Sequence, residues 1–150
     1  MAIALGVFQD RDQVVRALEL LNQQGISSRD IALVVRDEQS KSFVRPITVS
    51  GFLRSDLGQE DIRMVEGMVL TSLVNAGIDM FEAVAYMKAV KRGYTLLAVR
   101  TKDSVSPWAA EAMRRSEAIA AIDSATEHEM AALPYTYRQQ YFAAHRALIR

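Results

Sequence analysis

The stretch from residue 3 to residue 35, IALGVFQDRDQVVRALELLNQQGISSRDIALVV, decides the fold. It opens with a short apolar run, Ile3 to Phe8, which is long enough for one buried strand. Apolar residues then recur at helical spacing, and Gly25 can end that helix because glycine adopts the left-handed conformation at little cost. A second apolar run, Ile31 to Val35, follows. The stretch therefore predicts a strand, a helix and a second strand.

The same order of elements returns later in the chain. Residues 94–99 predict a strand, Ser106 and Pro107 predict the N-cap and first turn of a helix, and residues 118–122 predict a last strand. The chain thus contains two β-α-β units, residues 3–35 and 94–122. Two such units that share one antiparallel sheet, with helices packed on one face, make a ferredoxin-like α+β fold. We expect this fold.

Two helices are expected between these units. One spans residues 59–76 and is ended by Gly77, and the next is ended by Gly93. Asp79 can cap the second helix, with Glu82 completing a capping box. The two helices are therefore an insertion in the ferredoxin-like pattern.

Residues 37–56 are the least regular part of the chain. Ile47 and Val49 alternate with polar residues, which predicts a short exposed strand. Pro46 has no N–H group to donate to a sheet, so this strand is expected at an edge.

The C-terminal segment differs in character from the rest. We expect residues 1–123 to form the ferredoxin-like domain and residues 124–150 to form an appended amphipathic helix. Tyrosine and arginine are favoured at the centres of protein interfaces, so the segment predicts a partner-binding surface. Packing across its own domain is the equal alternative. The expected partner-binding residues are Tyr135, Tyr137, Tyr141, Phe142, Arg138 and Arg146.

Composition excludes several classes of function. The chain has 150 residues, with 18 basic and 18 acidic side chains and no cysteine. A zero net charge gives no global argument for nucleic-acid binding. The lack of cysteine excludes disulfides, thiolate metal sites and a cysteine nucleophile. The N-terminal residues do not resemble a signal peptide, and no apolar run approaches the roughly 20 residues of a membrane span, so we expect a cytoplasmic protein.

Residues 76–99 resemble a known family. The sequence AGIDMFEA at residues 76–83, followed by Tyr86 and by VKRGYTLLAV at residues 90–99, is similar to the bacterial general stress protein 17M-like domain, also called heat-induced stress protein. The start of the chain, with Gly6-Val7-Phe8, is similar to the start of that family. The resemblance implies a stress-associated protein whose function is largely unknown, and it implies no catalytic residue.

Candidate metal and anion sites are weak in this sequence. His128 lies between Glu127 and Glu129, and neighbouring residues of an extended segment point to opposite sides, so this triplet is a poor chelate. His145 lies on the aromatic face of the C-terminal segment, where packing is the commoner role. Basic residues at strand ends could collect an anion, although solvated charges are the commoner outcome; they are Arg36, Lys91, Arg92, Arg100 and Lys102. We expect no catalytic, cofactor-binding or metal-binding residue and no cofactor.

Three functions from different classes fit these observations. The leading hypothesis is a non-enzymatic stress-associated protein that acts through self-association, as a homodimer, or through a protein partner. The alternative is a small-ligand sensor. The third is an enzyme that uses Tyr86, Tyr94 or His128 as acid or base.

Overall fold

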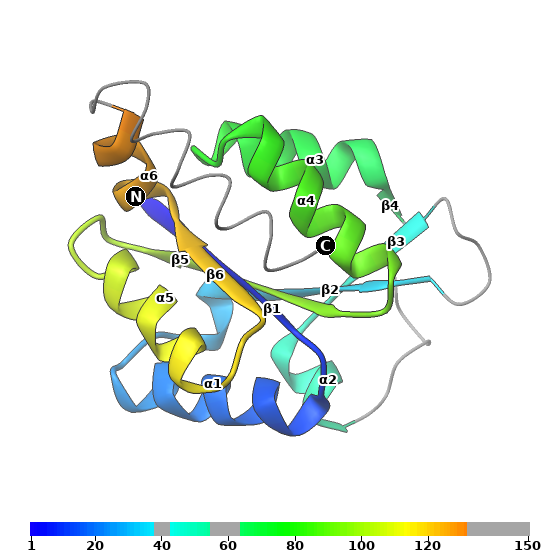
Figure 1. The fold of residues 1–150 in the computed structure, drawn as a ribbon. Coiled ribbons are helices and arrows are strands. Elements are labelled where there is room, and N and C mark those ends of the chain that lie inside the picture. The colour runs from blue at the N-terminus through cyan, green and yellow to red at the C-terminus, as the bar shows by residue number, and fades with distance from the viewer. Residues whose placement is uncertain (38–42, 55–63, 132–150) are drawn as a thin grey trace.

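The computed structural model describes residues 1–37, 43–54 and 64–131 (Figure 1). Those residues form an α+β domain around a six-stranded sheet, in the order β4-β3-β2-β5-β1-β6, and every pair of neighbouring strands is antiparallel. The elements are β1 (Ala2–Phe8), α1 (Arg11–Gln23), the 3₁₀ helix η1 (Ser28–Asp30), β2 (Ile31–Arg36), β3 (Phe43–Ile47), α2 (Val49–Arg54), β4 (Met64–Val65), α3 (Glu66–Asn75), α4 (Met80–Lys91), β5 (Thr95–Thr101), α5 (Ser106–Arg115), β6 (Ala120–Asp123) and α6 (Ser124–Ala131).

The two β-α-β segments interlock in the centre of the sheet. β1 and β2 lie on either side of β5 and are joined by α1, while β5 and β6 lie on either side of β1 and are joined by α5. Every residue of β1 has a partner in β5, from Ala2 opposite Thr101 to Phe8 opposite Thr95. The centre of the sheet therefore forms only when the segment from β1 to β2 pairs with the segment from β5 to β6.

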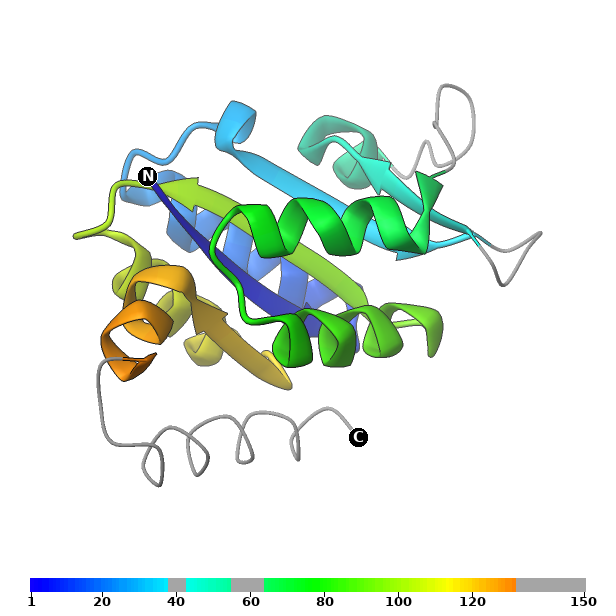
Figure 2. The same cartoon turned by 90° about the horizontal axis from the view of Figure 1, so that it is seen from above.

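Helices cover both faces of the sheet, whereas the sequence predicted helices on one face. Ala4 and Phe8 of β1 pack in a cluster with α1 and α5, and Leu5 and Val7 pack in a second cluster with α3 and α4. Figure 1 shows α3 and α4 above the sheet and α1, α2 and α5 below it. Figure 2 shows α3 and α4 lying side by side across it. The physical reason is that β1 is apolar on both sides, so each face needs a cover.

The irregular region differs from its prediction in two ways. β3 lies between β2 and β4 rather than at the edge, and Val49 begins a helix rather than continuing a strand. Pro46 pairs with Val34 of β2, but β4 reaches only as far as Phe43 and Val44 of β3. The missing N–H group of Pro46 is therefore tolerated, because no described strand pairs with its other side.

The helix predicted over residues 59–76 begins only at Glu66 in the described chain, because Met64 and Val65 pair with β3 as strand β4. The C-terminal ends of the helices follow the predicted chemistry. Gly25, Gly77 and Gly93 follow α1, α3 and α4 with φ of 82°, 104° and 103°. The Asp79 carboxylate accepts bonds from the N–H groups of Phe81 and Glu82 at the start of α4. Ser106 is not the N-cap of α5, because Val105 occupies that position. The Ser106 hydroxyl is buried and donates to Asp123, 2.7 Å away.

The C-terminal end of the described chain follows directly from the sheet. β6 is an edge strand, and Arg114 of α5 donates to the Ala121 carbonyl of β6 at 2.8 Å. α6 begins at Ser124, the residue after β6 ends. Within the described ranges, no helix has the length and apolar character needed to cross a membrane.

Candidate ligand cavity between α1 and α2

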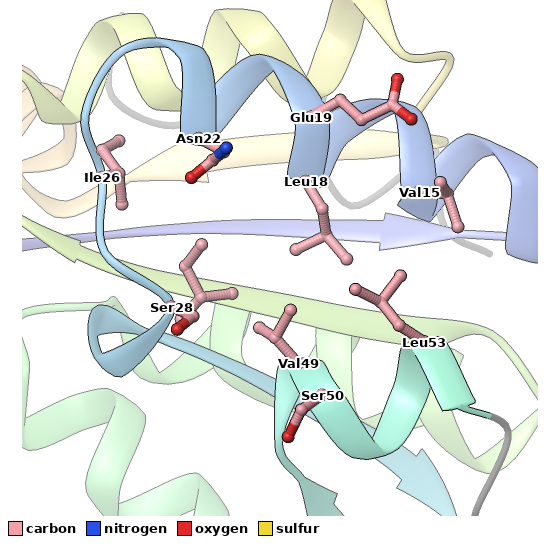
Figure 3. A pocket seen from close by; sticks show the side chains of 10 residues that line it. Val15, Leu18, Glu19, Asn22, Ile26, Ser28, Val49, Ser50 and Leu53 are labelled. Carbon is pink, nitrogen blue, oxygen red and sulfur yellow. The ribbon is translucent and has the colours of Figure 1, made fainter.

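A cavity of about 430 Å³ lies between α1 and α2, over the start of β2 (Figure 3). The described residues around it come from α1, the loop after it, η1, the start of β2 and α2. Its lining is Val15, Leu18, Glu19, Asn22, Ile26, Ser28, Ile31, Val49, Ser50 and Leu53.

The interior of the cavity is apolar because helical spacing directs aliphatic side chains into it. Val15 and Leu18 are three residues apart on α1, and Val49 and Leu53 are four apart on α2, so each pair shares one face of its helix. Leu18 is almost fully buried, whereas Leu53 remains 48% exposed.

Polar side chains lie around the rim of the cavity. Figure 3 shows Asn22 and Ser28 at the end near Ile26, with Glu19 farther along α1. The Ser50 hydroxyl lies 3.2 Å from the Thr48 hydroxyl, so it is already engaged. Glu19 is the only charged residue among the described lining residues.

Arg11 fixes the position of α2 against α1. Its guanidinium donates to the carbonyl oxygens of Phe52 and Leu53, at 3.2 and 3.0 Å, and lies 5.2 Å from the centre of the Phe52 ring. These carbonyls are at the C-terminal end of α2, where a positive charge is favourable. The bridge links the start of α1 to the end of α2, the two helices on either side of the cavity.

A second cavity, of about 590 Å³, lies where β1 begins and β6 ends, and is more polar. It is lined in part by Met1, Asp103 and His128. The N-terminal ammonium group of Met1 lies 3.3 Å from Asp103, so this acid already has a charged partner. His128 is exposed on α6. Neither of the two cavities is lined by Tyr86 or Tyr94, the other acid-base candidates from the sequence.

A group of buried carboxylic acids lies where α6 meets the start of α4. Glu127 is only 3% exposed, and its Oε2 accepts a bond from the backbone N–H of Asp79 at 3.1 Å. Burial raises the pKa of Glu127 to about 8; the hydrogen bond from Asp79 opposes this rise, and the charges of Glu82, Asp79 and Asp123 add to it. Asp123 is itself occupied, because its Oδ2 accepts bonds from Ser106 and from the Thr126 N–H group.

Sequence reasoning missed the cavity and the burial of Glu127. Glu82 was expected to complete a capping box, but its side chain is fully buried. One signal for that burial was present, because Glu82, Tyr86 and Val90 follow one another at intervals of four residues and all three are buried. Helical periodicity thus places Glu82 on the inner face of α4.

The predicted basic residues are only partly brought together: the Arg36 guanidinium lies beside Gly93, the residue after Arg92. Arg100 pairs with Asp30 at 3.0 Å and Lys91 pairs with Glu66 at 3.0 Å, so these two basic residues serve separate ion pairs. No group of three or more His, Asp and Glu side chains in the described ranges could hold a metal ion. The predicted partner-binding residues lie outside the described residues; they are Tyr135, Tyr137, Tyr141, Phe142, Arg138 and Arg146.

The chain was compared with protein-family models, with curated proteins and with solved structures, and none of the three comparisons gave a match.

Proposed function

We propose that this protein is a small-molecule-binding domain, which acts by holding a largely apolar ligand between α1 and α2. The observation that carries the proposal is the 430 Å³ apolar cavity at that place. Ligand sites in proteins typically measure about 300 to 1,000 Å³, with an apolar lining and a few polar groups that orient the ligand. The Arg11 bridge supports the proposal, because it links α1 to α2 before a ligand binds. Less binding free energy is then lost to ordering these helices.

The proposed scaffold is a ferredoxin-like core that carries an insertion. The strand order β2-β5-β1-β6, with a helix joining β1 to β2 and another joining β5 to β6, supports this assignment. The insertion then runs from β3 to α4. It contributes α2, one wall of the cavity, so the ligand site belongs to the junction of core and insertion.

Self-association, a role in stress and a cytoplasmic location remain predictions from the sequence. The residues expected to mediate self-association lie in the segment 134–150, outside the described part of the chain.

An uncharged fluorescent probe tests the proposal directly. N-phenyl-1-naphthylamine brightens on entering an apolar site, so titration with the protein should give saturable binding with one probe per chain. Val49→Trp places a large side chain in the cavity and should abolish this binding. Circular dichroism and the melting temperature establish that the variant is folded.

A matched pair of variants separates the cavity from other exposed apolar surface. Leu53→Gln removes an apolar side chain at the cavity. It should lower the affinity for the probe about fivefold, because a partly covered leucine is lost. Met68→Gln changes a comparably exposed apolar residue of α3 and should leave the affinity unchanged. The proposal is wrong if the wild type does not bind the probe, or if a folded Val49→Trp variant binds it equally well.

A further inference from the structure

The charge around the α1–α2 cavity indicates the chemistry of its ligand, on the premise that the proposed function is correct. Glu19 is its one formally charged lining residue, and no basic side chain lines it among the residues that the structure describes. The Glu19 carboxylate is exposed and makes no ion pair with any described residue. The rim therefore presents a negative charge that the described protein does not neutralise.

The nearest basic residues of α1 are engaged elsewhere. Arg16, one turn before Glu19, lies 3.8 Å from Glu117 in the loop after α5. Arg11, at the start of α1, donates to the carbonyl oxygens of α2. A ligand anion would thus meet Glu19 without a compensating cation from the lining, whereas a ligand cation would be attracted.

Two further acceptors, Asn22 and Ser28, lie at the end of the cavity near Ile26. Asn22 follows Glu19 by three residues on α1; Figure 3 shows the Glu19 carboxylate directed toward Val15 and the Asn22 amide at the end near Ile26. Figure 3 shows Ser28 across from Asn22 at one end of the cavity. The amide oxygen of Asn22 and the hydroxyl of Ser28 make no side-chain hydrogen bond within the described part of the chain, so both are available to a ligand.

We propose that the ligand is a primary amine with an apolar body: the body occupies the space between Leu18, Val49 and Leu53, and the ammonium group stays at the rim beside Glu19. An ammonium group carries three N–H donors and no acceptor, which matches a rim that supplies carboxylate, amide and hydroxyl oxygens. Because the rim is solvated, the charge selects among head groups only moderately, while the apolar contacts supply most of the affinity.

Three ligands with the same chain and different head groups test the inference. Octylammonium, 1-octanol and octanoate are each titrated against the protein carrying N-phenyl-1-naphthylamine, and displacement of the probe gives their affinities. We expect octylammonium to bind about fivefold more tightly than 1-octanol at low salt, and octanoate to bind most weakly. Raising the salt concentration should shrink these differences, because screening weakens exposed charge pairs.

Glu19→Gln identifies the source of the preference. In this variant the affinity for 1-octanol should not change, while the affinity for octylammonium should fall to that for 1-octanol. Asp12→Asn, on the same helix but away from the cavity lining, should keep the wild-type order. If 1-octanol displaces the probe but octylammonium binds no more tightly, or if its advantage persists in Glu19→Gln, the amine inference is wrong and the binding site stands. If none of the three displaces the probe, the proposed function itself fails.

Discussion

Replacing Glu127 by glutamine should remove a large part of the pH dependence of stability in this protein. The carboxyl group is almost fully buried between α6 and the start of α4, and burial raises its pKa from 4.5 to about 8. In unfolded chains the group is solvated and titrates near its ordinary value. The folded protein therefore keeps a proton on Glu127 that the unfolded chain has already released at neutral pH.

The direction and size of the effect follow from proton linkage. Because the pKa is raised by folding, the stability from this group is complete below about pH 4.5 and is lost as the pH rises toward 8. Between about pH 5.5 and pH 7.5, each pH unit lowers the unfolding free energy by about 1.4 kcal/mol. The reason is that Glu127 is ionised in the unfolded chain and protonated in the folded one. The unfolding free energy of the wild type should fall by about 2 to 3 kcal/mol across this window, relative to that of Glu127→Gln.

Urea unfolding at a series of pH values measures this difference. Glutamine keeps an oxygen that can accept the bond from the Asp79 N–H group, but it does not titrate. Glu129→Gln is the matched control: the same substitution on the same helix, at an exposed position, should leave the pH dependence of the wild type intact. Parallel curves for the wild type and Glu127→Gln between pH 5.5 and 7.5 would refute the reasoning.

Three further predictions concern packing and assembly. Gly6→Ala should destabilise the protein by about 1 to 3 kcal/mol in urea unfolding, because the new methyl group would lie 2.7 Å from the sulfur of the buried Met113. Gly67→Ala in α3 should instead stabilise it by about 0.5 to 1 kcal/mol, because nothing lies within 4 Å of the added methyl group and alanine favours a helix. Deleting residues 134–150 should change the oligomeric state or the solubility measured by native mass spectrometry and light scattering; an unchanged, monodisperse protein would contradict self-association through this segment.

Local patterns predicted those elements whose signals lie within one segment. The helical spacing of Val14, Val15, Leu18 and Leu21 predicted α1; Val14, Leu18 and Leu21 are buried and Val15 is half-buried. The buried side also includes Ala17, which the prediction left out. The short helix α2 escaped prediction because its six residues, VSGFLR, contain a glycine and a β-branched residue, and their helical form depends on packing against the sheet and on the Arg11 bridge.

The candidate site was beyond sequence reasoning for a different reason. The cavity exists only because Leu18 and Leu53, which are 35 positions apart, face one another across β2. Likewise, Glu127 appeared as part of a charged triplet, and only its contact with Asp79, 48 residues earlier, explains its burial. Patterns within a segment show which face of a helix is apolar, but they do not show which distant segment covers it.

The interlocked sheet has a consequence for how this protein is made. β1 pairs with β5 and β6, and β2 pairs with β3 and β5, so neither strand of the first β-α-β unit finds its central partner until residues 95–101 have left the ribosome. The nascent N-terminal third must therefore wait with Leu5 and Val7 exposed, although they are fully buried in the finished protein. Such long-range pairing slows folding and extends the time during which apolar strands can meet other chains. A protein of this topology should depend on protection of its first strands during synthesis more than one whose neighbouring strands are consecutive.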